Sequence, residues 1–127
     1  MGSDADVLLA RQTGRKVAER VGFAGSDLTM ISTAISELAR NIIRYARTGE
    51  VVVSTISDEG RVGVMVVARD SGPGIPDIDH AMRDGYTTGS GMGLGLPGAR
   101  RLMDEFAIFS EVSEGTTVVM KKWTRGI

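Results

Sequence analysis

The chain has 127 residues, no cysteine, one histidine and a formal net charge of −1 at pH 7. That length fits one domain spanning residues 1–127, which can bury a core without cross-links. The lack of cysteine excludes a disulfide framework, a thiolate nucleophile and a cysteine-ligated metal. The near-neutral charge argues against nucleic acid or an anionic membrane as the main partner. No apolar run is long enough to span a membrane, so we expect a cytoplasmic protein.

The first two predicted elements are helices. One is expected from near the N-terminus to Gly22, a natural C-cap, and the other over about residues 27–46. In the second helix, apolar side chains recur at alternating three- and four-residue spacing and form one stripe. The stripe consists of Leu28, Ile31, Ile35, Leu38, Ile42 and Tyr45. We expect this face of the helix in the core.

Glu37 and Asn41 lie beside that stripe. They are four residues apart, so they share one face of the helix, about 100–120° around from the centre of the stripe. Arg40 and Arg44 are expected to point further out, toward water. A carboxylate and an amide at the border of a core can form the floor of a cleft. The same pattern also fits the solvated flank of an ordinary amphipathic helix.

The rest of the chain predicts two hairpins separated by a loop and a third helix. Strands at 50–57 and 61–69 flank a turn at 58–60, and strands at 107–112 and 116–123 flank a turn at 113–115. Between the hairpins we expect a short helix at 78–83, a glycine-rich loop at 84–95 and a helix at 96–106. Because helices and strands do not alternate regularly, this order favours an α+β two-layer sandwich over a doubly wound sheet.

Asp70 stands at the end of the apolar second strand, directly before a glycine- and proline-rich turn. Gly72 and Gly74 flank Pro73, so the backbone here is able to adopt a positive φ or to approach a ligand closely. A charged side chain after a buried strand is costly for structure alone. The simpler interpretation is an aspartate that caps its own turn.

The glycine-rich loop offers a site for phosphate. Gly91, Gly93 and Gly95 lead into the third predicted helix, whose first N–H groups and positive dipole end suit phosphate oxygens. Residues 93–98 also match the dinucleotide fingerprint G-x-G-x-x-G, but they follow no strand and lie in no βαβ unit. We therefore reject a Rossmann site, and a merely flexible loop is the alternative.

Taken in order, these segments resemble the four nucleotide-binding boxes of the GHKL ATPases, the superfamily of gyrase, Hsp90, histidine kinases and MutL. The matching segments are Glu37-x-x-x-Asn41, Asp70-x-Gly72-x-Gly74, Gly91-x-Gly93-Leu94-Gly95 and Gly115-Thr116. Within the superfamily, residues 35–42, 70–78, 95–98 and 101–106 closely resemble the RsbT-type serine/threonine kinases of the bacterial stressosome. The resemblance covers essentially the whole chain. It implies the Bergerat fold, in which a mixed sheet carries helices on one face and ATP lies between the layers.

The resemblance also implies a role for each matching residue. Glu37 would be the general base that accepts the proton of the acceptor Ser or Thr, and Asn41 would coordinate Mg²⁺. Asp70 would accept a hydrogen bond from the adenine amino group. The remaining nucleotide-binding residues would be Gly72 and Gly74 beside the base, Gly91, Gly93, Leu94 and Gly95 in the phosphate-binding lid, and Thr116 in the adenine network.

The implied activity is phosphorylation of STAS-domain scaffold and antagonist proteins, followed by activation of a PP2C-type phosphatase when the kinase is released. Two features depart from the relatives. The related anti-sigma kinases carry a lid arginine where this chain has Gly89, which leaves Arg100 and Arg101 as candidates for the positive charge at the γ-phosphate. Relatives usually have a strand before the first helix, so we expect the sheet to lack one edge strand or to leave that edge for a partner.

Three other functions stay open at this point. The first is an anti-sigma factor kinase, which sequesters a sigma factor and phosphorylates a STAS-domain antagonist. The second is a binding module without catalysis. The third, a histidine kinase catalytic domain, is disfavoured because no dimerisation helices or phosphoacceptor histidine accompany the boxes.

Overall fold

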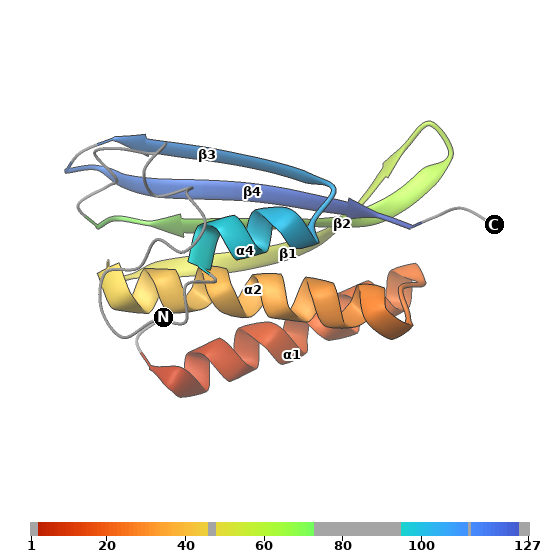
Figure 1. Cartoon of the computed structure of the whole chain (residues 1–127), viewed down its shortest axis with the longest axis horizontal. Coiled ribbons are helices and arrows are strands. Elements are labelled where there is room, and N and C mark those ends of the chain that lie inside the picture. Colours follow the sequence, from red (N-terminus) through yellow and green to blue (C-terminus); the bar gives the residue numbers. More distant parts are fainter. Residues whose placement is uncertain (1–2, 46–47, 73–94, 112, 125–127) are drawn as a thin grey trace.

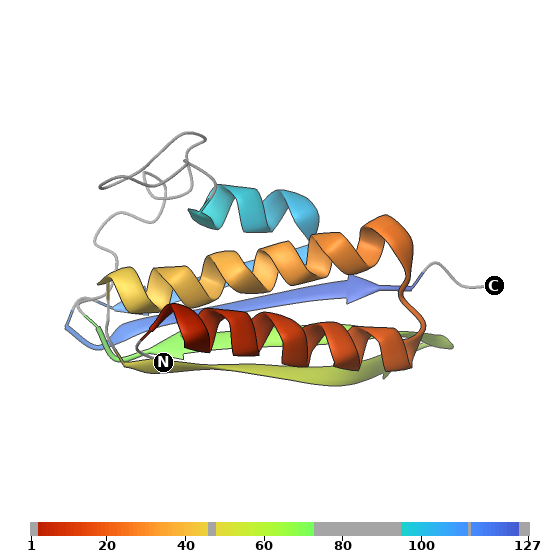
Figure 2. The same cartoon turned by 90° about the horizontal axis from the view of Figure 1, so that it is seen from below.

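The structure is a computed structural model that describes residues 3–45, 48–72, 95–111 and 113–124. Its elements in chain order are α1 (Asp4–Val21), α2 (Gly25–Tyr45), β1 (Gly49–Asp58), β2 (Arg61–Asp70), α4 (Gly95–Leu102), β3 (Glu105–Glu111) and β4 (Gly115–Trp123). The three helices lie on one face of a four-stranded sheet (Figures 1 and 2). This confirms the predicted α+β two-layer sandwich.

The first helix, α1, is capped at both ends, and it ends at Gly22 as its sequence predicts. At its start, the backbone N–H of Ser3 donates to a carboxylate oxygen of Asp6 at 3.2 Å, which satisfies one of the donors that a helix leaves open. At its end, Gly22 adopts the left-handed conformation with φ of 117°, and its N–H donates to Ala18 and Glu19. Glycine reaches this conformation without a steric penalty, so it terminates the helix.

Five of the six residues of the predicted apolar stripe of α2 lie in the core, and the side chain of the sixth, Tyr45, lies outside what the structure describes. Leu28, Ile31, Ile35, Leu38 and Ile42 are each at most 5% exposed. They pack against the inner side chains of the sheet and against α4 in one continuous cluster. Burial of such a stripe, at roughly 25 cal/mol per Å² of apolar surface, is the main reason that this helix is stable in the folded chain.

The described sheet has the order β1-β2-β4-β3, and every pair of neighbouring strands is antiparallel. The prediction of a mixed sheet is therefore wrong for the four described strands, which are all antiparallel to their neighbours. Two hairpins account for β1–β2 and β3–β4, because a short turn can only join antiparallel neighbours. In the first hairpin, Glu59 and Gly60 both have positive φ, as a two-residue turn of this hand requires.

The third helix is shorter than predicted. It ends at Leu102 instead of 106, and Phe106 lies in β3 opposite Met120. Two contacts with β4 stop the helix: the N–H of Asp104 donates to the carbonyl of Lys121 at 3.0 Å, and the buried Lys122 amine donates to the carbonyl of Leu102 at 3.1 Å. The apolar residues 102, 103 and 106 that suggested a continuous helix still pack in or against the core, from a helix end, a turn and a strand.

Among the helices that the structure describes, none is long and apolar enough to cross a membrane.

Candidate functional site

Asp70 fastens the end of β2 to the start of β4. Its side chain is half-buried, and its Oδ1 accepts two hydrogen bonds, from the N–H of Thr116 at 3.1 Å and from the N–H of Gly72 at 3.0 Å. Among the described residues, Oδ2 has no hydrogen-bond donor. The turn-capping role that the sequence offered is therefore confirmed for Oδ1, which accepts from the N–H of Gly72. The predicted site role of Asp70 would use the other carboxylate oxygen, Oδ2.

Gly115 makes room for this arrangement. A Cβ at this position would lie 2.1 Å from the backbone oxygen of Asp70, and the residue has φ of +117°. Both the close approach and the conformation require glycine. The Gly115-Thr116 pair, unremarkable as a hairpin sequence, is therefore what lets Thr116 reach Asp70.

Thr116 has a second partner on the edge strand β3. Its Oγ1 lies 2.9 Å from the Oγ of Ser110, which faces it across the β3–β4 pair. The Ser110 hydroxyl also donates to the carbonyl of Gly115 at 3.3 Å. Asp70, Thr116 and Ser110 thus form one polar group across three neighbouring strands.

Ser110 was not predicted to belong to this group, because no local signal in the sequence marks it. Its contact with Thr116 depends on the register of the hairpin, and only the pairing of Ser110 with Thr116 reveals it. A second missed contact joins Ser71 to Thr48. Their hydroxyls are 2.8 Å apart, which ties the turn after Asp70 to the start of β1.

Glu37 and Asn41 lie at the border of the core, as predicted. Both are half-buried, while Leu38 and Ala39 between them are buried. The Arg40 side chain, 51% exposed, donates to Oε1 of Glu37 at 2.8 Å, and the Glu37 side chain is 13% exposed. The second carboxylate oxygen of Glu37 has no partner within the described ranges. The predicted outward direction of Arg40 is confirmed, but its bond to Glu37 was not foreseen.

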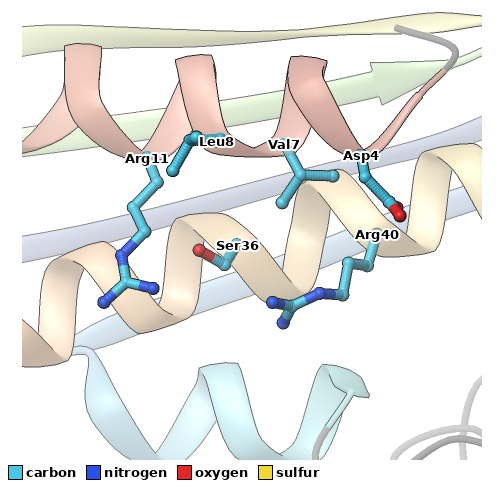
Figure 3. A pocket seen from close by; sticks show the side chains of 6 residues that line it. All are labelled: Asp4, Val7, Leu8, Arg11, Ser36 and Arg40. Carbon is cyan, nitrogen blue, oxygen red and sulfur yellow. The ribbon is translucent and has the colours of Figure 1, made fainter.

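A pocket opens beside this pair, between α1 and α2 (Figure 3). It has a volume of about 250 Å³ and is lined by Asp4, Val7, Leu8, Arg11, Ser36 and Arg40. None of the predicted nucleotide-binding residues lines it, so it is distinct from the site built around Asp70. Arg40 lines this pocket and also bonds to Glu37.

The fit of Mg²⁺ to this chain rests on Asn41. Its amide is half-buried beside Glu37 and has no hydrogen-bond partner among the described residues, and an amide oxygen is a suitable ligand for a hard cation. In residues 3–45, 48–72, 95–111 and 113–124, no three His, Cys, Asp or Glu side chains converge on one point. A magnesium ion here would take its other ligands from phosphates and water, as Mg²⁺ commonly does.

Several predicted site residues lie outside the described residues. These are Gly74, Gly91, Gly93 and Leu94, together with the expected short helix at 78–83 and the position of Gly89. Gly95 is the first residue of α4, which packs on the core through Leu96 and Ala99. Arg100 and Arg101 of this helix are exposed.

The sequence matches a known domain over almost its whole length. A profile described as "Histidine kinase-like ATPase domain" matches residues 3–122. The chain is 50% identical over 120 residues to the serine/threonine-protein kinase RsbT of Bacillus subtilis, covering 94% of this chain and 90% of that protein. It is 39% identical over 103 residues to the anti-sigma F factor of Geobacillus stearothermophilus, covering 76% and 69%.

The fold has close neighbours among solved structures. The mycobacterial sensor histidine kinase MprB superposes with a TM-score of 0.61 at 17% identity, over 97% of this chain and 95% of that chain. Full-length ShkA in complex with AMPPNP superposes with a TM-score of 0.57 at 20% identity, over 96% and 30%. At such identities the likeness establishes the shared fold and no more.

Proposed function

Because the chain belongs to the histidine kinase-like ATPase domain family, we propose that it is a partner-switching protein kinase that phosphorylates STAS-domain proteins of a stressosome. The chain is an ATP-dependent protein serine/threonine kinase, and the proposal concerns its acceptors, its partners and the roles of its residues. One observation carries it: the 50% identity to RsbT extends over 94% of the chain. When released from these acceptors, the kinase would bind and activate a PP2C-type phosphatase.

Asp70 would select the base of the nucleotide. Oδ1 is held by two backbone N–H groups, so the carboxylate keeps a fixed orientation and Oδ2 accepts from the adenine amino group. Gly72 belongs to the turn that fixes Asp70, Gly74 would let the backbone approach the base, and Thr116 would join the same network.

Asn41 would hold Mg²⁺, which supplies charge neutralisation at the β- and γ-phosphates when bound. Gly91, Gly93, Leu94 and Gly95 would form the phosphate cradle ahead of α4. Arg100 and Arg101 remain the candidates for a positive charge near the γ-phosphate. Phosphoryl transfer needs mainly positioning and charge stabilisation, so these few groups suffice.

Glu37 would take the proton of the acceptor hydroxyl through Oε2, since Oε1 is bonded to Arg40. In the transfer step, the acceptor oxygen forms a bond to the γ-phosphorus and the bond to the β,γ-bridging oxygen breaks. The hydroxyl proton passes to Glu37, and ADP leaves with the electron pair of the broken bond. Arg40 acts here as a positioning residue, because it limits the rotation of the carboxylate that accepts the proton.

A phosphotransfer assay on a panel of STAS-domain proteins tests the proposal. Purified protein with ATP and Mg²⁺ should produce phosphoserine or phosphothreonine on at least one of them, detected by phosphopeptide mass spectrometry. The immobilised kinase should retain a PP2C-type phosphatase in the absence of acceptor, and addition of the unphosphorylated acceptor should release that phosphatase. If ATP binds but no STAS-domain protein is phosphorylated, the assignment of the acceptor is wrong.

A second candidate follows from the 39% identity to an anti-sigma F factor. In this function the kinase would sequester a sigma factor and phosphorylate a STAS-domain antagonist. Recovery of a sigma subunit on the immobilised protein, instead of a STAS assembly or phosphatase, would favour it. In either function we expect the protein in the cytoplasm.

A further inference from the structure

Ser110 continues a row of side chains that crosses three strands on the helix-covered face. Ala68 of β2, Val118 of β4 and Ile108 of β3 face one another in register, and all three lie in or against the core. Side chains two residues further along a strand point to the same face. Two residues further along each strand, toward the end of the sheet, Asp70, Thr116 and Ser110 therefore lie side by side. The hydrogen bonds between them confirm this.

The donors in this group can be assigned by counting hydrogens. A hydroxyl has one hydrogen to donate, and a carbonyl oxygen only accepts. The 3.3 Å contact between Ser110 Oγ and the Gly115 carbonyl thus uses the hydrogen of Ser110. In the 2.9 Å contact between the two hydroxyls either oxygen can donate, and we assign Thr116 as the donor because the Gly115 carbonyl can take only the hydrogen of Ser110.

This assignment fixes what Thr116 offers to a ligand. With its hydrogen directed at Ser110, Thr116 Oγ1 presents only lone pairs, and so does the Oδ2 of the Asp70 carboxylate. Two acceptors, reached directly or through a water, suit an amino group, which carries two N–H donors. They disfavour a purine that carries a carbonyl oxygen at the same position.

We infer that Ser110 is a positioning residue for base selection: by holding the Thr116 hydroxyl as an acceptor, it favours an amino purine over a keto purine. This inference rests on the proposed nucleotide site and deepens it. Ser110 needs no contact with the nucleotide, because it acts through Thr116.

Calorimetric titration of the whole chain with the magnesium complexes of ATP and inosine triphosphate tests the inference. Inosine triphosphate carries a carbonyl oxygen in place of the amino group of adenine. Ser110→Ala frees the Thr116 hydroxyl to rotate and donate, so the preference for ATP over inosine triphosphate should fall by about three- to tenfold, the value of one neutral hydrogen bond. Ser57→Ala, an exposed serine at the opposite end of β1, is the matched control and should leave the preference unchanged.

A double-mutant cycle separates positioning from a merely structural role. Thr116→Val removes the hydroxyl that Ser110 orients, so Ser110→Ala should have no further effect on the preference in that background. Ser110→Thr keeps the hydroxyl and should restore most of the preference. Thermal denaturation of each variant establishes that it is folded.

Three results would overturn the inference. Ser110→Ala could weaken both nucleotides equally, or its effect could persist in the Thr116→Val background. In either case ATP still binds and the proposed function stands, while the role of Ser110 fails. If the unmodified protein binds neither nucleotide, the nucleotide site itself fails and the inference fails with it.

Discussion

The Oδ1 of Asp70 accepts a hydrogen bond from the backbone N–H of Thr116 at 3.1 Å, although the two residues are 46 positions apart in the sequence. The bond joins the last residue of β2 to the second residue of β4. A hydrogen bond to a charged acceptor is stronger than a neutral one, so it fixes the direction of the carboxylate. Asp70 is thereby a structural clamp and a candidate ligand group at once.

Replacing Asp70 with asparagine should separate these two functions. The amide oxygen of Asp70→Asn still accepts from Thr116 and Gly72, so the free energy of unfolding should fall by only about 1 kcal/mol. The amide nitrogen, however, replaces the free acceptor with a donor. Affinity for ATP should fall at least about tenfold in calorimetry, since a donor then faces the amino group of adenine.

Asp58→Asn is the control for this variant. Asp58 lies at the far end of β1 in an exposed ion pair with Arg61, so its loss should not change the affinity for ATP. Unchanged ATP binding by Asp70→Asn would show that Asp70 does not contact the base.

Gly115→Ala should destabilise the protein strongly, because the new Cβ collides with the backbone of Asp70 and the residue keeps a positive φ. We expect a loss of at least about 2 kcal/mol in urea denaturation. Gly60→Ala separates the two causes. Gly60 also has a positive φ, of +84°, but a Cβ on this residue would meet nothing within 4 Å. Its substitution should cost clearly less, about 1 kcal/mol, and equal losses would contradict the close-approach argument.

Local patterns in the sequence predicted the elements well. The spacing of apolar residues in α2, the glycine cap of α1 and the turn at Glu59-Gly60 are each encoded within a few residues, so they are visible without a structure. The end of α4 was not visible, because it is decided by contacts with Lys121 and Lys122 of β4. Tertiary pairing there outweighs a helical pattern.

The candidate site, too, was predictable only where local sequence patterns determine it. Glu37 and Asn41 could be placed at the core border from helical geometry, and Asp70 from its position after an apolar strand. The contact of Asp70 with Thr116 depends on strand order, and that of Ser110 depends on hairpin register. Neither contact can be predicted from the spacing of residues along the chain.

Glu37→Gln should reduce phosphotransfer and leave nucleotide binding intact. Glutamine keeps the shape and can still accept from Arg40, but it cannot take the proton of the acceptor hydroxyl. We expect the transfer rate to fall by about 10²–10⁴-fold, while the affinity for ATP stays within about twofold. Glu19→Gln on α1, where Glu19 pairs with Arg15, is the control and should transfer normally. Transfer at the normal rate by Glu37→Gln would exclude Glu37 as the base.

Asn41→Ala should lower the affinity for ATP only when Mg²⁺ is present. If the Asn41 amide holds Mg²⁺, its loss should lower the affinity for ATP by about tenfold with Mg²⁺ present and leave the metal-free affinity unchanged. Calorimetry with and without EDTA measures both. An equal loss in the two conditions would place Asn41 against the nucleotide or the fold instead of the metal.

Arg40→Ala should slow transfer without weakening ATP binding or the fold. The Arg40 side chain is 51% exposed, so loss of its 2.8 Å pair with Glu37 should change the free energy of unfolding by no more than about 0.5 kcal/mol. A carboxylate free to rotate is in the right geometry less often, and we expect kcat to fall by about tenfold at unchanged KM for ATP. Arg40→Lys should recover part of the rate, because an ammonium can still reach Oε1 but holds it less rigidly. Arg15→Ala, which breaks the exposed pair with Glu19 on α1, is the matched control. A normal kcat in Arg40→Ala would mean that Glu37 is oriented by the helix alone, and a raised kcat would mean that the pair restrains the base.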